Sequence, residues 1–335
     1  MPQSPSLPGT TDRRLAALLT LLSENATIVI SGARIARETG MSRSTVWRWV
    51  EELRKLGVHV KGQRSTGYFL EKVPDLLTPD LLRKRMKGNL FGKRVFHFFK
   101  TDSTNRVAME LGYAGEPEGT VVMAEAQTAG RGRSGRAWHS EKGTGLYFTV
   151  LLRPRLAPAQ APLLTMLAGV SAQTAIAVQT GMVPELKWPN DLLLNGKKLG
   201  GILTEMHAEP NAVRFVIVGI GINVNQEKFP PELSSTATSI REETGRLSYR
   251  LELLARLLTQ FESDYNRFLR EGPAFVVDRF ESVSSFARGR RVRVNTGVDS
   301  YAGTTAGLSP EGLLLVQRDG GALVTVIAGD VTEVR

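Results

Sequence analysis

Residues 187–205 read Lys-Trp-Pro-Asn-Asp-Leu-Leu-Leu-Asn-Gly-Lys-Lys-Leu-Gly-Gly-Ile-Leu-Thr-Glu, and they determine the local fold and chemistry in the middle of the chain. Lys187 follows an apolar residue and precedes a rigid Trp-Pro pair, which predicts a cation held in one position. Asn190 and Asp191 are expected to begin a turn, with Asp191 balancing charge or contacting a metal. Residues 197–205 are expected to enter a strand, where paired glycines permit close approach of other groups.

A segment rich in glycine and arginine precedes it: residues 127–136 read Gln-Thr-Ala-Gly-Arg-Gly-Arg-Ser-Gly-Arg. Glycines let the backbone approach a ligand and move, and arginines offer forked donors to phosphate or carboxylate. We expect a disordered loop that folds over an anionic ligand. The alternatives are an RGG-like nucleic-acid tail or a solvated basic loop. The segment is short and is followed at once by Ala137, Trp138 and a predicted strand, which disfavours both alternatives.

Two further segments place polar side chains at the ends of predicted elements. Residues 102–105, Asp-Ser-Thr-Asn, lie at a predicted strand-to-helix junction, where they can cap the helix and bind the polar head of a ligand. Residues 219–225, Gly-Ile-Gly-Ile-Asn-Val-Asn, end an apolar strand with two amides. This Gly-x-Gly is not a dinucleotide-binding fingerprint, because the third glycine and the following helix are missing.

Several kinds of chemistry are excluded by what the sequence lacks. It has no cysteine, so disulfides, Cys-ligated zinc, iron–sulfur clusters and thiol catalysis are excluded. It also lacks a P-loop, an HExxH motif and a GxSxG motif. We predict no metal site made by the protein itself, because no metal-ligand spacing relates the four histidines, His59, His97, His139 and His207.

The charge balance predicts anionic partners. The 335 residues include 43 Lys and Arg against 33 Asp and Glu, a formal net charge of +10. Such a charge favours nucleic acid, nucleotide phosphates or acidic protein surfaces, although a general bias toward arginine would produce it too. Residues 1–10 lack the apolar core of a signal peptide, and no run of about 18 uninterrupted apolar residues occurs. We therefore expect a cytoplasmic protein that does not span a membrane.

The chain divides by pattern into three parts. Residues 11–72 are basic and contain three short helices followed by two short strands. Residues 85–285 alternate strands and helices, which predicts an α+β (mixed α/β) domain with one main sheet. Residues 286–335 are all β by pattern and predict a small barrel. The expected strands are 121–124, 146–152, 215–220, 291–294, 313–316 and 323–327, the expected helices in the middle part are 162–180 and 249–269, and Pro74 and Pro79 mark an expected linker.

The first part has the order of a winged helix-turn-helix. Ser31 and Ser42 are expected to cap the second and third helices, which end at Gly40 and Gly57. Met41 can pack between the two helices. Two short helices joined by a tight turn, the second opening with polar and basic residues, form the arrangement that places a helix in the DNA major groove.

The exposed positions of the third helix are of types that contact phosphates and base edges. After it, residues 58–60 and 62–70 are expected to form two strands joined by a basic turn, a wing that reaches the flanking DNA backbone. The alternative is a three-helix unit used only as a scaffold or docking module. The sequence pattern assigns no role to Trp47 or Trp49. The predicted DNA contacts are Arg43, Ser44, Thr45 and Arg48 on the helix and Arg64, next to Gln63, in the wing.

These motifs occur in the order found in biotin–protein ligases, and the chain resembles that family from about residue 12 to its end. With the winged helix-turn-helix, it resembles the bifunctional members that also repress the biotin operon. The run at 130–138 and Lys-Trp-Pro-Asn-Asp at 187–191 are the most specific parts of this resemblance. The resemblance implies a class II synthetase-like catalytic domain and a C-terminal SH3-like β-barrel.

The resemblance also implies a reaction in two steps. The carboxylate of biotin attacks the α-phosphate of ATP, which gives biotinyl-5′-AMP and pyrophosphate. A lysine of the biotin carboxyl carrier domain of acetyl-CoA carboxylase then attacks the mixed anhydride. Because a carboxylate meets a triphosphate, the site must supply positive charge together with Mg²⁺ bound to the substrate.

The resemblance assigns roles to particular residues. Lys187 would lie between the biotin carboxylate and the α-phosphate and stabilise charge in both steps, and Asn223 would hold the nucleotide or its magnesium. Arg131 and Arg133 would share the catalytic role of Lys187. The residues expected to bind biotin are Ser103, Thr104, Asn105 and Gln127, and those expected to close over biotin and adenylate are Arg131, Gly132 and Arg133.

Relatives that repress transcription form homodimers when the adenylate orders their loops, and the dimer places two helix-turn-helix units on a palindromic operator. The resemblance therefore implies operator DNA and a second copy of the chain as partners. The sequence departs from some of these relatives in a second loop, residues 226–238. That loop has no tryptophan to cover adenine, and Phe229 is its only aromatic residue.

Three other functions compete with this hypothesis. A lipoate–protein ligase shares the catalytic fold, but that family usually has an RRxSGGG-type loop where this chain has GRGRSGR. A transcription factor that senses a small molecule without catalysis would not need Lys187 together with Arg131 and Arg133. A ligase with a vestigial DNA-binding domain is the strongest competitor, and loss of specific DNA binding with retained ligation would decide for it.

Overall fold

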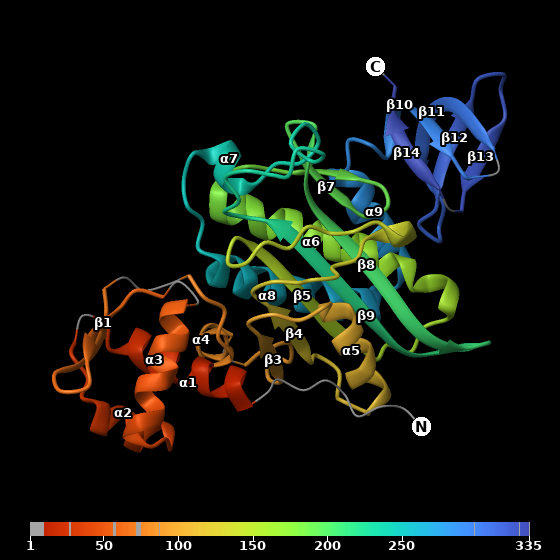
Figure 1. Ribbon diagram of the computed structural model, residues 1–335. Helices are drawn as coiled ribbons and strands as arrows, with labels where there is room; N and C mark the ends of the chain where they lie inside the picture. Colours follow the sequence, from red (N-terminus) through yellow and green to blue (C-terminus); the bar gives the residue numbers. More distant parts are fainter. Residues whose placement is uncertain are drawn as a thin grey trace.

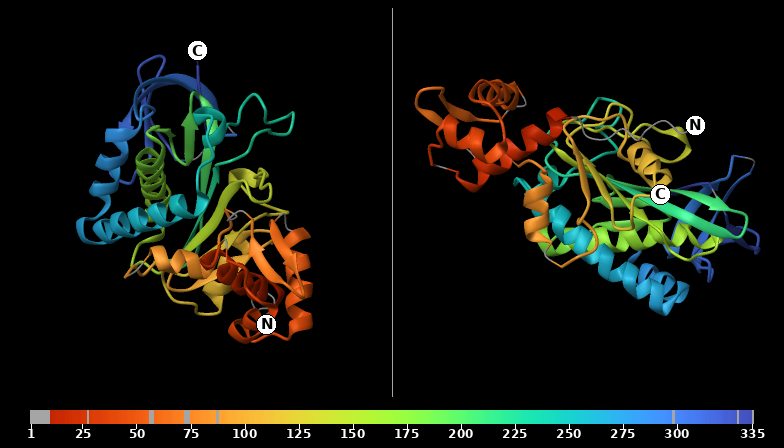
Figure 2. Two further views of the ribbon diagram at one scale, coloured as in Figure 1. Left: turned by 90° about the vertical axis from the view of Figure 1, so that its left-hand side faces the viewer. Right: turned by 90° about the horizontal axis from the view of Figure 1, so that it is seen from below.

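The computed structural model describes residues 10–26, 28–55, 58–71, 75–86, 88–297, 299–327 and 329–334 (Figure 1). An N-terminal helical unit, a central part with a seven-stranded sheet and a C-terminal five-stranded sheet follow one another along the chain. The N-terminal unit and the C-terminal sheet lie at opposite ends of the central part (Figures 1 and 2).

The N-terminal unit confirms the predicted capping pattern. The Ser31 hydroxyl accepts a hydrogen bond from the Arg34 amide at 3.2 Å, and Gly40 ends that helix in the left-handed region with φ 66°. The Ser42 hydroxyl accepts from the Thr45 amide at 3.2 Å. The unit consists of helices α1 (Thr10–Glu24), α2 (Gly32–Thr39) and α3 (Arg43–Lys55) and strands β1 (Val60–Gln63) and β2 (Gly67–Leu70).

Two details of this region differ from the prediction. The first wing strand begins at Val60 rather than Val58, because the Val58 amide donates to the Leu53 carbonyl at 3.0 Å and closes the preceding helix. Pro79, expected in a linker, is the first residue of α4 (Pro79–Arg85), where the missing amide hydrogen of proline costs nothing. The predicted positions of Gly57 and Pro74 lie outside the described residues.

The central sheet has the strand order β3-β4-β5-β9-β8-β7-β6. Neighbouring strands are antiparallel except β3 and β4, which are parallel. Every residue of β5 is buried, as expected of a central strand with helices on both faces. The strands are β3 (Val95–Phe98), β4 (Val121–Ala124), β5 (Gly145–Leu152), β6 (Glu185–Lys187), β7 (Asp191–Leu194), β8 (Lys197–Glu209) and β9 (Ala212–Asn223).

Helices cover both faces of this sheet and create two hydrophobic cores. Helix α5 (Thr104–Tyr113) packs on one face around Val107, Leu111 and Phe215. On the other face, α6 (Pro162–Thr180), α8 (Arg250–Glu271) and α9 (Pro273–Val283) pack on one another and enclose the larger core. A short helix, α7 (Ile240–Thr244), lies between them in sequence.

Helix α6 has the bounds that the sequence predicted. Together with the turn before it, residues 158–180, it is long and apolar enough to cross a membrane by length and composition. Yet 78% of its apolar window is buried inside the protein. We therefore assign it to the core of the central part, where its apolar side chains pack on the sheet and on α8.

The C-terminal part is a five-stranded antiparallel sheet in the order β13-β12-β11-β10-β14, consistent with the predicted SH3-like fold. It contacts the central part directly, because the Trp188 indole donates to the Gly312 carbonyl at 3.0 Å. The strands are β10 (Arg288–Asn295), β11 (Ser300–Leu308), β12 (Leu314–Arg318), β13 (Leu323–Val326) and β14 (Asp330–Glu333).

Candidate functional site

Two adjoining cavities lie on the central sheet, and they bring together all of the residues predicted to bind biotin or adenylate. The larger has a volume of about 270 Å³ and the smaller about 40 Å³. Gly132, Trp138, Asn190 and Lys198 line both. Of the predicted residues, Ser103, Thr104, Asn105, Gln127, Arg131 and Gly132 line the smaller cavity, and Gly132, Arg133, Lys187 and Asn223 line the larger.

The smaller cavity is walled by polar groups at the start of α5. The side-chain oxygen Oε1 of Gln127 accepts from the Thr104 backbone amide at 2.8 Å, and its side-chain nitrogen Nε2 donates to the Ser140 hydroxyl at 2.9 Å. Ser103 occupies the N-cap position of α5, and its hydroxyl makes no side-chain capping bond. Gln127, which follows β4, satisfies the end of the helix instead.

Asn105 is fixed from three sides. Its amide nitrogen donates to Glu205 at 2.7 Å and to the Leu203 carbonyl at 3.2 Å, and its oxygen accepts from the Thr149 hydroxyl at 2.7 Å. A Cβ on Gly219 would lie only 1.9 Å from the Asn105 oxygen. This glycine of the quoted 219–225 segment therefore makes room for a side chain of the protein that forms the cavity wall.

Trp138 lines both cavities. Its ring lies against β9, where a Cβ on Gly221 would come within 2.6 Å of the indole. The Lys198 ammonium is 5.8 Å from the centre of the ring, which adds a cation–π contact. Trp138 directly follows the Gly/Arg segment, so the sequence contained a signal for it, but only as the end of a loop.

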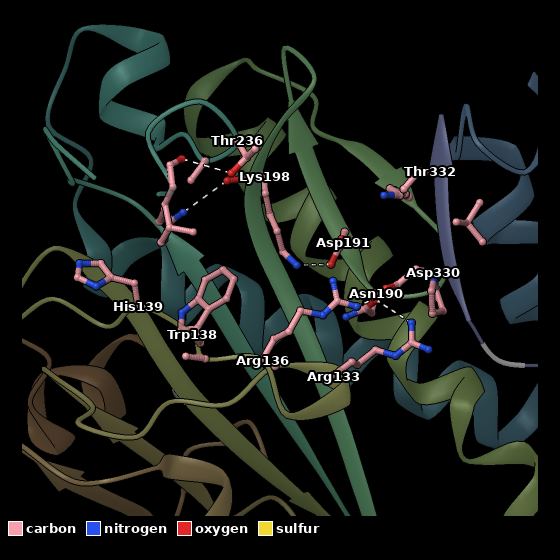
Figure 3. Close-up of a pocket in the computed structure, with 18 of the residues that line it drawn as sticks. Arg133, Arg136, Trp138, His139, Asn190, Asp191, Lys198, Thr236, Asp330 and Thr332 are labelled. Atoms are coloured by element: carbon pink, nitrogen blue, oxygen red, sulfur yellow. Dashed lines mark hydrogen bonds and ion pairs between the residues drawn. The ribbon is translucent and has the colours of Figure 1, made fainter. Parts of the chain in front are cut away.

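Two lysines approach the site from β6 and β8, the strands on either side of β7. Lys187 ends β6 opposite Asp191 of β7 and lines only the larger cavity, whereas Lys198 lines both cavities. The Lys198 ammonium pairs with Asp191 at 2.6 Å (Figure 3). Burial lowers the pKa of Lys187, and the nearby charge of Asp191 partly opposes that effect. Lys198 thus lies at the junction of the cavities, and the role predicted for Lys187 stays a prediction.

The Gly/Arg segment forms a hairpin rather than the disordered loop that the sequence suggested. Arg131 and Ala137 pair as in an antiparallel sheet, and the Trp138 amide donates to the Gly130 carbonyl at 2.8 Å. Its arginines have partners elsewhere. Arg131 pairs with Glu205 of β8 at 3.4 Å, Arg133 donates to the Asn190 side chain at 3.2 Å, and Arg136 pairs with Asp330 of β14.

The larger cavity is suited to a polyanion. Four basic side chains line it, Arg133, Arg136, Lys187 and Lys198, against the two carboxylates Asp191 and Asp330. The cluster of positive charge inside a concave wall attracts phosphate groups. Arg133 is half-buried, and burial lowers the pKa of its guanidinium. Sequence reasoning assigned no site role to Lys198 or to the two C-terminal residues Asp330 and Thr332 that line this cavity, and it identified Arg136 only as one arginine of the Gly/Arg segment.

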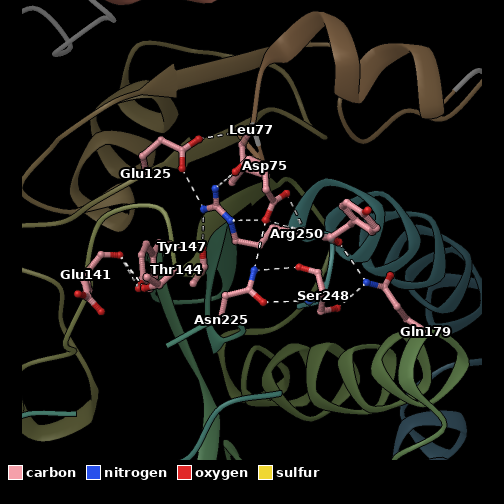
Figure 4. Close-up of polar contacts among 12 residues, drawn as sticks. Asp75, Leu77, Glu125, Glu141, Thr144, Tyr147, Gln179, Asn225, Ser248 and Arg250 are labelled. Carbon is pink, nitrogen blue, oxygen red and sulfur yellow. Dashed lines mark hydrogen bonds and ion pairs between the residues drawn. The ribbon is translucent and has the colours of Figure 1, made fainter. Parts of the chain in front are cut away.

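A buried ionic cluster supports the base of the site (Figure 4). Arg250, at the start of α8, is wholly buried and donates to Glu125 at 2.9 Å, to Asp75 at 3.0 Å and to the Gly145 carbonyl at 3.0 Å. Glu125 stands two residues before Gln127. The cluster therefore holds the end of β4, the start of β5 and the segment that follows the N-terminal unit in one arrangement.

The charge of Glu125 is maintained by its partners. Burial alone would raise its pKa, but the charge of Arg250, the His97 ring 3.6 Å away and a hydrogen bond from the Leu77 amide outweigh burial and lower the pKa of Glu125 to about 2. The Asn225 amide donates to the Ser248 carbonyl at 2.9 Å and to Asp75 at 3.4 Å, which ties the end of β9 to the same cluster. Both halves of the site thus rest on one buried network.

The residues predicted to contact DNA lie apart from these cavities, in the N-terminal unit. Arg43, Ser44 and Arg48 are exposed on α3, and Thr45 is half-buried. The Ser42 hydroxyl bonds the hydroxyls of both Ser44, at 2.9 Å, and Thr45, at 2.7 Å, so these two are partly occupied within the helix cap. Arg64 is exposed in the turn between β1 and β2.

The chain is similar to known proteins along most of its length. Three family models match it: the HTH domain at residues 14–69, the biotin/lipoate A/B protein ligase family at 98–223 and the biotin protein ligase C-terminal domain at 288–332. The bifunctional ligase/repressor BirA of Bacillus subtilis is 39% identical over 306 residues, which cover 91% of this chain and 94% of that protein.

Two further relatives support this match. A biotin–[acetyl-CoA-carboxylase] ligase of Mycobacterium tuberculosis is 33% identical over 272 residues, 78% of this chain and 98% of that protein. The structure of biotin protein ligase from Aquifex aeolicus in complex with biotin and ATP has a TM-score of 0.62 at 33% identity and covers 72% of this chain and 99% of that one. The matches confirm the predicted fold class, a class II synthetase-like α+β ligase domain between a helix-turn-helix and an SH3-like β domain.

Proposed function

Since the chain belongs to the family of biotin–protein ligases, in the bifunctional form that carries a DNA-binding domain, we propose that it is an ATP-dependent biotin–protein ligase and a transcriptional repressor. It activates biotin as biotinyl-5′-AMP and transfers it to a lysine of the biotin carboxyl carrier domain of acetyl-CoA carboxylase. Because ATP, the carrier protein and operator DNA meet in the cytoplasm, we place the protein there.

The observation that carries this proposal is the pair of joined cavities with Lys198 at their junction. The smaller, polar cavity next to Gln127 suits the ureido head of biotin, and the larger, basic cavity suits a nucleotide triphosphate. A ligand that spans both would place its carboxylate and the α-phosphate near the Lys198 ammonium. Such a cation stabilises the charge that develops as two anions meet.

The first step joins the biotin carboxylate oxygen to the α-phosphorus and releases pyrophosphate. We assign the central position to Lys198, and Lys187, which lines only the larger cavity, contacts the leaving phosphates. Arg131 and Arg133 on the hairpin also stabilise the negative charge that develops where the biotin carboxylate meets the α-phosphate. In the second step the neutral amine of the carrier lysine attacks the anhydride carbonyl, AMP leaves, and the amide forms as the amine loses a proton.

Magnesium accompanies the nucleotide in this proposal. Among the described residues, no group of three or more His, Asp or Glu side chains is placed to hold a metal. Magnesium commonly binds through substrate phosphates and one or two carboxylates, which fits a cavity lined by Asp191 and Asp330. Asp191 with Asn223 would hold it, and it would neutralise phosphate charge.

Phe229 and Leu233, from residues 226–238, also line the larger cavity. Although that segment has no tryptophan, Phe229 gives it an aromatic ring that can cover the adenine. Lys198 anchors the end of the segment, because its backbone amide donates to the Thr236 carbonyl at 2.7 Å. We propose that the adenylate holds this segment and the preformed hairpin in one arrangement around it and that two adenylate-bound copies form the homodimer that binds DNA.

The repressor function rests on the cations exposed on α3 and in the wing, Arg43, Arg48 and Arg64. Replacing Arg43 and Arg48 together by alanine should weaken operator binding and leave biotin transfer intact. Equal loss of both activities would assign the two residues to folding. Retained transfer with no specific DNA binding by the wild-type chain would identify a ligase with a vestigial DNA-binding domain.

The test of the ligase is pyrophosphate release that depends on biotin and ATP, followed by transfer to a carboxyl carrier domain, with lipoate as the competing substrate. Lys198→Ala should slow adenylate formation by about 10²-fold or more, the usual scale for losing one electrostatic stabiliser. Lys197→Ala is the matched control, because Lys197 pairs with Glu242 and lines neither cavity. Preference for lipoate, or equal losses in the two variants, would contradict the proposal.

A further inference from the structure

The helix α3 exposes a tryptophan on the surface that is expected to face DNA. Trp47 is 40% exposed, whereas Trp49, two residues later, is buried in the core of the N-terminal unit. Neither tryptophan had a role that could be predicted from the sequence. Trp49 packs in the core. Trp47 exposes a large apolar indole to water, which is unfavourable unless another group covers it.

That partner comes from the wing. The Arg64 guanidinium carbon lies 4.4 Å above the centre of the Trp47 ring, well within the range of a cation–π contact. A guanidinium that stacks by its flat face keeps its N–H donors free at the edges. Arg64 can therefore rest on Trp47 and still donate hydrogen bonds to a third group.

The base of the wing is tied to the same helix. Arg54, in the last turn of α3, donates to the Val60 carbonyl and to the Gly62 carbonyl, each at 2.9 Å. The Arg54 side chain is itself paired with Glu51 at 2.6 Å. Helix and wing are thus joined twice, at the base through Arg54 and at the tip through Arg64 and Trp47, so they present one preformed surface.

The charge on this surface selects the partner. Residues 43–50 of α3 contain two arginines and no acidic residue, and Arg64 adds a third cation beside them. An acidic protein surface and DNA could both be attracted by charge. A protruding helix with a wing at its flank has the shape of a domain that inserts a helix into the DNA major groove. In that arrangement the cation at the wing tip contacts the phosphate backbone next to the groove.

We propose that Trp47 is a positioning residue for DNA binding: its indole holds Arg64 in the orientation that meets a phosphate beside the groove that α3 enters. The inference rests on the proposed DNA-binding function. Holding the side chain in place before binding removes the loss of rotamer freedom that a mobile arginine would suffer on the DNA. Trp47 therefore strengthens a contact that it does not itself make.

The test uses the full chain with biotin and ATP and, as probe, the duplex that the wild-type chain selects from a randomised DNA library. Trp47→Leu keeps apolar bulk but removes the cation–π contact, and it should weaken binding about two- to fivefold per DNA-binding domain. Trp47→Phe keeps a ring face and should restore most of the affinity. In an Arg64→Ala background, Trp47→Leu should cause no further loss.

Salt dependence separates positioning from contact. Arg64→Ala should lower the steepness of log K against log salt by about one phosphate contact per domain. Trp47→Leu should leave that slope unchanged, because Arg64 still reaches the phosphate once bound. Biotin transfer to the carrier domain should be the same in all variants, which shows that they fold.

Three outcomes would overturn the inference. Additive losses in the double variant would mean that Trp47 touches DNA itself. An Arg64→Ala variant with wild-type affinity would mean that the wing tip makes no contact. A wild-type chain that selects no duplex at all, yet transfers biotin, would refute the DNA-binding function and the inference with it, and this result is distinct from the other two.

Discussion

The ionic cluster at the base of the ligand site and the hairpin of the Gly/Arg segment both contain ion pairs between arginine and a carboxylate. The two sets of pairs lie in opposite surroundings. At the base, Arg250 and Glu125 are both wholly buried and lie 2.9 Å apart. On the hairpin, Arg131 and Arg136 are about half exposed and pair with carboxylates of distant strands. Water competes for the exposed pairs, whereas breaking the buried pair leaves a charge without compensation. We infer that the base is built to stay fixed and the hairpin to exchange partners when an anionic ligand arrives.

The largest effect should come from breaking the base. Arg250→Met keeps apolar length but leaves Glu125 and Asp75 without their cation. We expect a loss of about 3–5 kcal/mol in the free energy of unfolding, the scale for removing one partner of a buried pair. Urea unfolding followed by circular dichroism measures this loss as a lower midpoint.

A matched variant on the same helix serves as the control. Arg267 forms an exposed pair with Glu271, one turn apart on α8. Arg267→Met should hardly change the urea midpoint, because solvent screens that pair and replaces it readily. If both variants lost the same stability, burial would not be what distinguishes the two regions.

A low pH should have the next largest effect, because it weakens the buried ionic cluster at the base of the site. The pKa of Glu125 is lowered from 4.5 to about 2, so its ionised form stabilises the fold above pH 4.5, and this contribution disappears as the pH falls toward 2. The shift corresponds to about 3 kcal/mol. The difference in unfolding free energy between the wild-type chain and Glu125→Gln should therefore shrink over this pH window. A difference that stays constant from pH 6 to pH 3 would contradict the assignment.

The sequence predicted best those elements whose limits are set locally. Helix α6 matches its predicted bounds because Pro162 fits the first helical turn and Gly181 ends the helix with φ 76°. Strand β4 has the predicted bounds, and it is a short apolar run buried on both sides. The residues predicted to bind the ligand also line the cavities. Their side-chain types, glycine, arginine, lysine and amide, indicated this role in the sequence.

Relations between distant residues could not be predicted in the same way. Lys187 and Lys198 belong to one quoted run, and only the pairing of β6, β7 and β8 decides which ammonium faces both cavities. Asp330 lies in the C-terminal sheet, and nothing in its local sequence connects it with Arg136. The hairpin was expected to be disordered because its composition shows glycine and charge, but not the distant carboxylates that pair with its arginines.

On the hairpin, the expected effects are smaller and concern ligand affinity. Asp330→Asn removes the partner of Arg136 and one negative charge from the larger cavity. The free energy of unfolding should change by at most about 1 kcal/mol, as for other exposed pairs. Arg136 would then be free for phosphate, so ATP should bind up to about fivefold more tightly in calorimetric titrations. Weaker ATP binding would instead indicate that Asp330 holds magnesium.

The smallest effect should come from Glu205, which stands where the two regions meet. Its carboxylate accepts from the buried Asn105 amide at 2.7 Å and pairs with the exposed Arg131 at 3.4 Å. Glu205→Gln keeps an oxygen for Asn105 but removes the charge that attracts Arg131. Because such a pair is worth well under 1 kcal/mol, we expect a two- to threefold faster release of biotinyl-5′-AMP and an unchanged urea midpoint. Glu209→Gln on the same strand, whose partner Arg214 is far from the cavities, should change neither quantity. A lower midpoint for Glu205→Gln with normal adenylate release would assign Glu205 to the fixed base rather than to the hairpin.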